Sequence, residues 1–208
     1  MLPFFEGFGA GLLLAFIVGP VFFTLLAISI RQGVATGVWT VLGIFSSDVI
    51  CVLLCAYGAS EMLAGNGNSY YLGLLGSVLL LLFGFNYLLK PGNAAGKASS
   101  EIILQKGRYV TAFAKGFLVN FVNPVVFAIW LGIIGVASGK YGFGSNLFLY
   151  LSGTLTCILL TDLLKAVFAA KLSGILHERW LIRMFRFIGL LLLVFGIRLL
   201  YHTIMELP

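Results

Sequence analysis

Long apolar stretches separated by short polar segments dominate this chain, and each is long enough to cross a lipid bilayer, which takes about 20 residues of helix. Apolar and polar residues do not alternate within these stretches, so they are expected to be helices rather than strands. The pattern predicts an all-α integral membrane protein with six transmembrane helices, at Phe4–Ile30, Val34–Tyr57, Tyr70–Leu89, Ala112–Val136, Phe143–Ala170 and Leu181–Tyr201.

The composition agrees with this class. Of the 208 residues, 61% are hydrophobic and 10% are charged, whereas a soluble domain has about 25% charged residues. No basic region precedes the first apolar stretch, so we expect it to be a first span rather than a cleaved signal peptide. We therefore treat residues 1–208 as a single membrane domain.

The basic residues decide the expected orientation. The net charge is +6, and all 13 lysines and arginines except Lys140 and Arg198 lie on the same side of the six predicted spans. Basic residues collect on the cytoplasmic side of membrane proteins, so both termini are predicted to lie outside the cytoplasm. The positive charge is thereby assigned to topology and to lipid headgroups, and not to a nucleic-acid partner.

The longest connection, residues 91–111, is rich in small and basic residues and has the composition of a cytoplasmic linker. It divides the chain into residues 1–90 and residues 112–208, with three predicted spans in each part. A repeat unit with an odd number of spans must insert its second copy upside down, and such inverted repeats are typical of secondary transporters. We therefore expect two inverted three-helix repeats.

Each half also carries a proline inside an apolar stretch, in the first and in the fourth span. Pro20 follows Gly19, and Pro124 follows Asn123. Proline inside a helix costs about 3 kcal/mol, but it is favoured as the first residue of a helix, with asparagine or glycine as the N-cap before it. We expect broken first and fourth helices whose second halves begin in mid-membrane, with amides and a positive dipole end suited to a carboxylate. The alternative is a plain kink in each helix, with the freed carbonyl satisfied by a neighbour.

Two aspartates lie inside predicted spans. Asp48 lies near the centre of the second span, where an aspartate costs roughly 3 kcal/mol. We expect it to face the bundle interior and to accept a substrate ammonium or a coupled proton; the alternative is a structural hydrogen bond to Ser46, to Ser47 or to a freed carbonyl. In the fifth span, Asp162 and Lys165 lie three residues apart on one helix face, which favours a local ion pair. A proton-coupling role for Asp162, by analogy with Asp48, is the alternative.

The other polar and sulfur-containing residues in the spans are less specific. Asn120 is a candidate for lining a cavity, although asparagines also form hydrogen bonds between membrane helices. The cysteines are expected to be small buried apolar residues, because their spacing matches neither a redox pair nor a zinc site. The sequence has no Walker A loop, His-Glu-x-x-His or Gly-x-Ser-x-Gly motif. We therefore expect a protein that is not an enzyme and that uses no metal or cofactor.

Together these features resemble the LysE/RhtB superfamily of amino-acid exporters, and the resemblance covers nearly the whole chain. The matching text is GFGAGLLLAFIVGPVFFTLLAISIRQG, then LGIFSSDVICVLL, then FAKGFLVNFVNPVVFAIW. Three positions depart from the family pattern. Val18 stands in place of the first proline of Pro-Gly-Pro, Ser47 in place of the glycine before the aspartate, and Val125 in place of a residue that is often basic or polar.

The resemblance implies a secondary transporter in the bacterial cytoplasmic (inner) membrane that exports small amino acids or related metabolites, driven by the proton-motive force. Amino acid, protons and membrane lipid are then the expected partners, and a homo-oligomer is compatible with the sequence. An inorganic-cation or metal transporter of the same superfamily is an alternative, and so is a membrane electron carrier, which would need a cysteine close to each helix break. With Asp48 and Asp162 as the candidates for proton coupling, the expected substrate-binding residues are Gly19, Pro20, Asp48, Asn120, Asn123 and Pro124.

Overall fold

A computed structural model describes residues 1–17, 19–63, 68–89, 108–169 and 178–206. Within these ranges the chain forms eight α-helices and no strand. Their bounds are α1 (Leu2–Ala15), α2 (Pro20–Gln32), α3 (Val34–Leu63), α4 (Asn68–Leu89), α6 (Arg108–Phe121), α7 (Pro124–Tyr141), α8 (Ser145–Val167) and α10 (Glu178–Glu206). Most of the predicted linker, residues 91–107, lies outside the described residues, and α6 begins at Arg108 rather than after Thr111.

Several of these helices have the length and apolarity of membrane spans. Among the described residues, α7, α8 and the part of α3 from Val34 to Ser60 each qualify, and α1 and α2 make a fourth if this bent pair is counted as one span. The apolar parts of α4 and α10 are shorter, at Gly73–Leu89 and Gly189–Met205. Large apolar side chains are also exposed on the outer surface, such as Phe16 at 81% and Val136 at 76%. The chain is therefore a multi-pass membrane protein, and the count of six spans stays a prediction.

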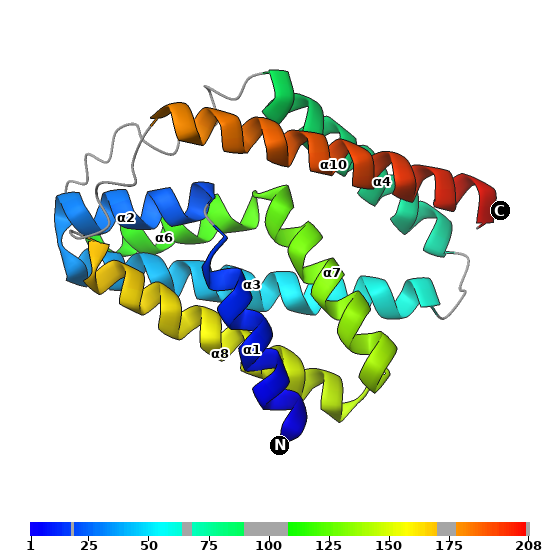
Figure 1. Ribbon diagram of the computed structural model, residues 1–208, viewed down its shortest axis with the longest axis horizontal. Coiled ribbons are helices and arrows are strands. Elements are labelled where there is room, and N and C mark those ends of the chain that lie inside the picture. Colours follow the sequence, from blue (N-terminus) through cyan, green and yellow to red (C-terminus); the bar gives the residue numbers. More distant parts are fainter. Residues whose placement is uncertain (18, 64–67, 90–107, 170–177, 207–208) are drawn as a thin grey trace.

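The first predicted break is present. The helix axis turns by 74° between α1 and α2, as Figure 1 shows for the dark blue helices at the N-terminus. Gly19 has extended backbone angles (φ −150°, ψ −171°) and serves as the N-cap, with Pro20 as the first residue of α2. Because proline has no amide hydrogen to donate, it fits where a new helix starts and not where an old one continues.

The second predicted break is present as well. The stretch predicted as one span from Ala112 to Val136 forms two helices, α6 and α7, which diverge in Figure 1. Asn123 is the N-cap of α7, with extended backbone angles (φ −83°, ψ 109°), and Pro124 is its first residue. Local chemistry thus places a helix start in the middle of each of these two apolar stretches.

Two pairs of helices approach closely through glycines in the same way. In the pair α1–α8, a Cβ on Gly7 would overlap the carbonyl of Tyr150, and a Cβ on Gly153 would overlap the carbonyl of Phe4. The pair α6–α3 has the same kind of contact. A Cβ on Gly116 would overlap the carbonyl of Thr40, and a Cβ on Gly43 would overlap the carbonyl of Phe113. Small residues let membrane helices pack at short distance, where dispersion and backbone contacts hold them together.

The helices that follow the two breaks also end alike. Both α2 and α7 stop at a glycine with positive φ, Gly33 at 87° and Gly142 at 65°, a conformation that other residues rarely adopt. Each glycine amide donates to the carbonyl of the serine four residues earlier, at 3.0 and 2.8 Å. Each helix carries one basic residue in its last turn, Arg31 in α2 and Lys140 in α7.

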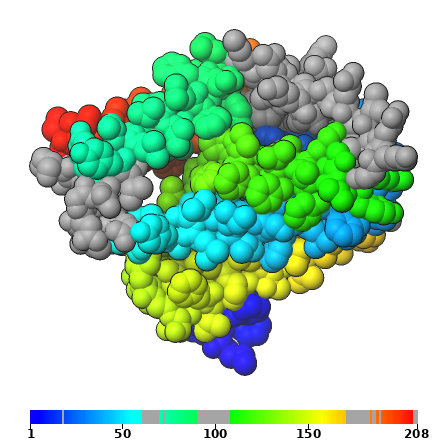
Figure 2. All heavy atoms as spheres, turned by 180° about the vertical axis from the view of Figure 1, so that it is seen from behind, coloured from blue at the N-terminus to red at the C-terminus, as the bar shows by residue number. Residues whose placement is uncertain are grey.

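Helix α3 lies at the centre of the bundle, in contact with α2, α4, α6, α7 and α8. Seen from behind, α3 runs between α6 on one side and α8 on the other (Figure 2). A buried apolar cluster joins α3 to α7 and α8, and it includes Cys51, Cys55 and Trp130. These two cysteines and Cys157 on α8 form no disulfide and are buried, which confirms their interpretation as core residues. On the far side, α4 and α10 pack together through Gly84 and Gly189.

Candidate functional site

The two helix breaks border one cavity of about 120 Å³, which also touches α3 and α8. For comparison, a cavity of roughly 150 Å³ in another protein binds benzene, which has six heavy atoms. A ligand of about the size of benzene is therefore what this cavity can hold as it stands. Its walls are largely apolar and include Leu14, Val21, Ile44, Val126, Ile129 and Ile158.

Most of the predicted site residues line this cavity. They are Gly19, Pro20, Asp48, Asn120, Asn123 and Asp162. Pro124 is buried but does not line the cavity, because it holds the first position of α7 behind Asn123. The structure therefore brings together residues from four predicted spans at the level of the breaks.

Asp48 on α3 is held by both halves of the second broken span. Its Oδ1 accepts a hydrogen bond of 2.8 Å from Nδ2 of Asn120 on α6 and one of 3.1 Å from Nε1 of Trp130 on α7. Asp48 as a whole is only 5% exposed, so it faces the bundle interior as predicted. The neighbouring serines have other partners: Ser46 donates to the carbonyl of Leu42 in its own helix, and the Ser47 hydroxyl accepts from Asn120.

Asn120 and Trp130 both donate to Oδ1 of Asp48, and within the described residues no hydrogen-bond donor binds the second oxygen, Oδ2. Asp48 lines the cavity, and one of its oxygens is already occupied by two donors. A carboxylate with one oxygen held and the other available is oriented to receive a cation or a proton from the cavity.

Asn120 combines the two alternatives that the sequence left open, a place on the cavity wall and hydrogen bonds between helices. It lines the cavity, and its Nδ2 lies within hydrogen-bond distance of Asp48, of the Ser47 hydroxyl at 3.2 Å and of the Ile44 carbonyl at 3.3 Å. These contacts join α6 to α3 beside the aspartate. Removing the amide would take one of its two donors from the buried Asp48 carboxylate, at a cost of about 1–3 kcal/mol.

Asp162 and Lys165 form the predicted ion pair on α8. Nζ of Lys165 donates to Oδ1 of Asp162 at 2.8 Å, and the two side chains are only 17% and 10% exposed. Both line the cavity, so the pair belongs to the site rather than to a separate helix face. Sequence reasoning did not include Lys165 among the site residues, although a lysine inside an apolar stretch was the signal that pointed to it.

Trp130 is the other site residue that the sequence did not single out. It is 2% exposed and donates from its indole nitrogen on α7 to Asp48 on α3. A tryptophan in an apolar stretch is common, and only its place shortly after the start of α7 marks it.

The two helix starts at the cavity differ in their capping. The side chain of Asn123 accepts a hydrogen bond of 3.1 Å from the amide of Val125, so α7 caps itself. Gly19 has no side chain, and α2 has no side-chain cap. The start of α2 is thus the more open of the two toward a ligand anion.

We expect replacement of Asn123 by alanine to lower the free energy of unfolding by about 1 kcal/mol, because the cap of α7 is lost. Asn123→Asp keeps the acceptor and should recover most of that loss, and Asn146→Ala, at an exposed position in the first turn of α8, is the matched control. Thermal unfolding in detergent measures all three. Unchanged stability of Asn123→Ala together with lost ligand binding would mean that Asn123 contacts the ligand and is no cap.

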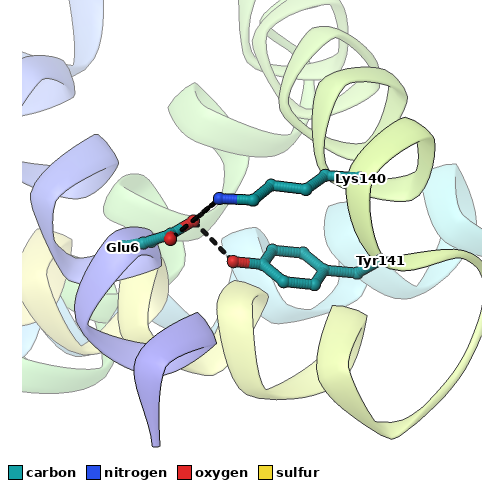
Figure 3. Close-up of polar contacts among 3 residues, drawn as sticks. All are labelled: Glu6, Lys140 and Tyr141. Atoms are coloured by element: carbon teal, nitrogen blue, oxygen red, sulfur yellow. Dashed lines mark hydrogen bonds and ion pairs between the residues drawn. The ribbon is translucent and has the colours of Figure 1, made fainter.

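A second polar cluster joins α1 and α7 at their ends away from the breaks (Figure 3). Glu6 accepts hydrogen bonds from Nζ of Lys140, at 2.8 and 2.6 Å, and from the hydroxyl of Tyr141. The lysine is 59% exposed and the glutamate 32%, so the pair contributes little to stability by itself. It does fix the distance between two helices that border the cavity at their other ends.

Comparisons with known proteins identify the family. The family model of the LysE type translocator matches residues 12–203. The chain is also similar to the "Putative amino acid efflux protein YcgF" of Bacillus subtilis (strain 168), with 32% identity over 204 residues, 95% of this chain and 94% of that protein. No solved structure matches the chain. Since the family match runs through both helix breaks and all the residues of the cavity, this protein belongs to the family of LysE type translocators.

Proposed function

We propose that this protein exports small amino acids across the cytoplasmic membrane in exchange for protons. The observation that carries the proposal is Asp48, a buried carboxylate with one oxygen held by Asn120 and Trp130 and the other available to a cavity at two helix breaks. The family of the protein, and its similarity to a protein named for amino acid efflux, support export as the direction of transport.

The cavity offers a partner for each end of an amino acid. The ammonium group would bind to Oδ2 of Asp48, and the carboxylate would bind at the open start of α2, next to Gly19. The capped start of α7 at Asn123 and Pro124 would shape the cavity and supply a weaker positive dipole end. The volume of about 120 Å³ favours small side chains.

Competition for Asp48 supplies the exchange. An ammonium group and a proton each neutralise the same carboxylate, so the site binds one or the other. An antiporter requires such mutually exclusive binding of its two substrates. Asp162 is a second candidate for proton binding, but its pairing with Lys165 makes it available only when that ion pair breaks.

We propose that the chain consists of two inverted three-helix repeats that rock against each other. The equivalent glycine contacts of α1 with α8 and of α6 with α3 support this architecture, and so do the matched ends of α2 and α7. The distribution of basic residues supports a cytoplasmic side at the connection between α2 and α3, with both termini outside.

The inorganic-cation alternative gains no support from the cavity. A metal cation at Asp48 and Asp162 would lie near the ammonium of Lys165, which already neutralises one of the two carboxylates.

The test is efflux from proteoliposomes loaded with labelled alanine, threonine or leucine. We expect acidification of the outside to accelerate efflux of at least one of them, and a protonophore to abolish that acceleration. Empty liposomes are the control for passive leakage. Equal efflux with and without the protein would exclude the function, and protein-dependent efflux that ignores the pH gradient would exclude the exchange for protons.

A further inference from the structure

We propose that Lys165 recognises the carboxylate of the substrate, so that the cavity selects zwitterionic amino acids over amines. This inference rests on the function proposed above and deepens it, because it names the group that distinguishes the substrate class. Lys165 lies outside the sequence motifs quoted above for the resemblance, and its proposed role rests on its geometry.

The direction of the Lys165 side chain is the first observation. Lys165 lies in the last turn of α8, where a lysine in a membrane helix would ordinarily extend its ammonium toward the nearer water. Instead its Nζ lies 2.8 Å from Asp162, one turn deeper in the helix, and 5.8 Å from the centre of the Phe22 ring. Phe22 is in the first turn of α2, so the ammonium points to the open helix start at the break.

The capacity of the ammonium for further hydrogen bonds is the second observation. A lysine ammonium has three N–H donors, and within the described residues Lys165 uses one of them, in the hydrogen bond to Asp162. Lys165 also lines the cavity. It can therefore keep Asp162 and still donate to a carboxylate oxygen of a ligand, so binding does not leave Asp162 as an unpaired buried charge.

The distribution of charge around the cavity is the third observation. Asp48 comes from α3 and the pair of Asp162 and Lys165 from α8, whereas the lining residues of α1, α2, α6 and α7 carry no ionisable side chain. One free carboxylate oxygen and one cation thus face the same small space from two helices. An α-amino acid presents an ammonium and a carboxylate on one carbon atom, which matches this pair of partners.

A purely structural ion pair is the rival explanation. A lysine near the end of a helix is stabilised by the helix dipole, and an aspartate three residues earlier stabilises it further. That explanation predicts an effect of Lys165 on stability and none on the choice between ligands.

The experiment compares each amino acid with its amide, which keeps the ammonium and lacks the carboxylate. Labelled alanine, threonine and leucine are the transported probes in proteoliposomes, and alaninamide, threoninamide and leucinamide are the competitors at mildly acidic pH. In the wild-type protein we expect the unlabelled amino acid to compete about 30-fold better than its amide, the effect of one additional charge-assisted hydrogen bond. In Lys165→Met we expect that ratio to fall to within about threefold of unity.

Two further variants separate recognition from folding. The double variant Asp162→Asn with Lys165→Met removes the pair without leaving an unpaired charge, and it should lose discrimination in the same way while remaining folded. Lys140→Met, a lysine outside the cavity, should keep the wild-type ratio.

The outcomes are distinct for this inference and for the proposed function. If none of the three amino acids is transported by the wild-type protein, the proposed function fails and the inference fails with it. If they are transported and the wild-type protein does not distinguish acid from amide, or the Lys165 variants keep the 30-fold ratio, the inference is wrong and amino-acid export stands.

Discussion

Replacing Asp48 by asparagine is expected to slow proton-driven amino-acid efflux about 100-fold, because the substrate ammonium loses its charged partner and the proton loses its binding site. A hydrogen bond to a charged group contributes up to about 3 kcal/mol, which corresponds to that factor. The fold should persist, since the amide oxygen of asparagine can still accept from Asn120 and Trp130. Efflux from proteoliposomes with an imposed pH gradient measures the effect, and thermal unfolding checks the fold.

Exchange of labelled against unlabelled amino acid, without a pH gradient, separates the two roles of Asp48. If exchange continues in Asp48→Asn while proton-driven efflux is lost, Asp48 binds the proton and not the ammonium. If both rates match the wild type, Asp48 has neither role. Glu6→Gln is the control carboxylate, because Glu6 lies outside the cavity in a partly exposed ion pair, and we expect it to change efflux by less than about fivefold.

The parts of the site that the sequence predicted are those governed by local chemistry or by the cost of burial in lipid. Proline after glycine or asparagine can start a helix but cannot continue one, so the breaks at Pro20 and Pro124 follow from two adjacent residues each. An aspartate in the middle of a span is too costly to face lipid, so the inward position of Asp48 follows from its type and place.

The parts that the sequence did not predict depend on contacts between distant segments. Trp130 reaches Asp48 across 82 positions of sequence, and no periodicity of α7 marks that contact. The direction of the Lys165 side chain is equally invisible, because an ion pair with Asp162 three residues away is compatible with an ammonium turned to lipid headgroups or to the cavity. For Asn123 the sequence predicted both an N-cap and a substrate-binding residue, and the hydrogen bond from the amide of Val125 shows the cap.

Helix packing offers a test of the repeat that is independent of transport. A Cβ on Gly116 of α6 would overlap the backbone carbonyl of Thr40 on α3, and in the pair α1–α8 a Cβ on Gly7 would overlap the carbonyl of Tyr150. A backbone atom cannot rotate out of the way as a side chain does. Relief requires the two helices to move apart, which loosens the packing along the contact.

We therefore expect Gly116→Ala to lower the free energy of unfolding by about 2–3 kcal/mol, or the thermal midpoint by about 5–10 °C, although alanine favours the helix more than glycine does. If the two contacts are equivalent, as two inverted repeats require, Gly7→Ala should have an effect of similar size. Gly135→Ala is the matched control, because a Cβ at this exposed position of α7 meets no atom within 4 Å, and we expect it to stabilise the protein slightly. Thermal unfolding in detergent compares the three variants. A loss confined to Gly116→Ala would contradict the equivalence of the two contacts, and a loss shared with Gly135→Ala would mean that close helix approach is not its cause.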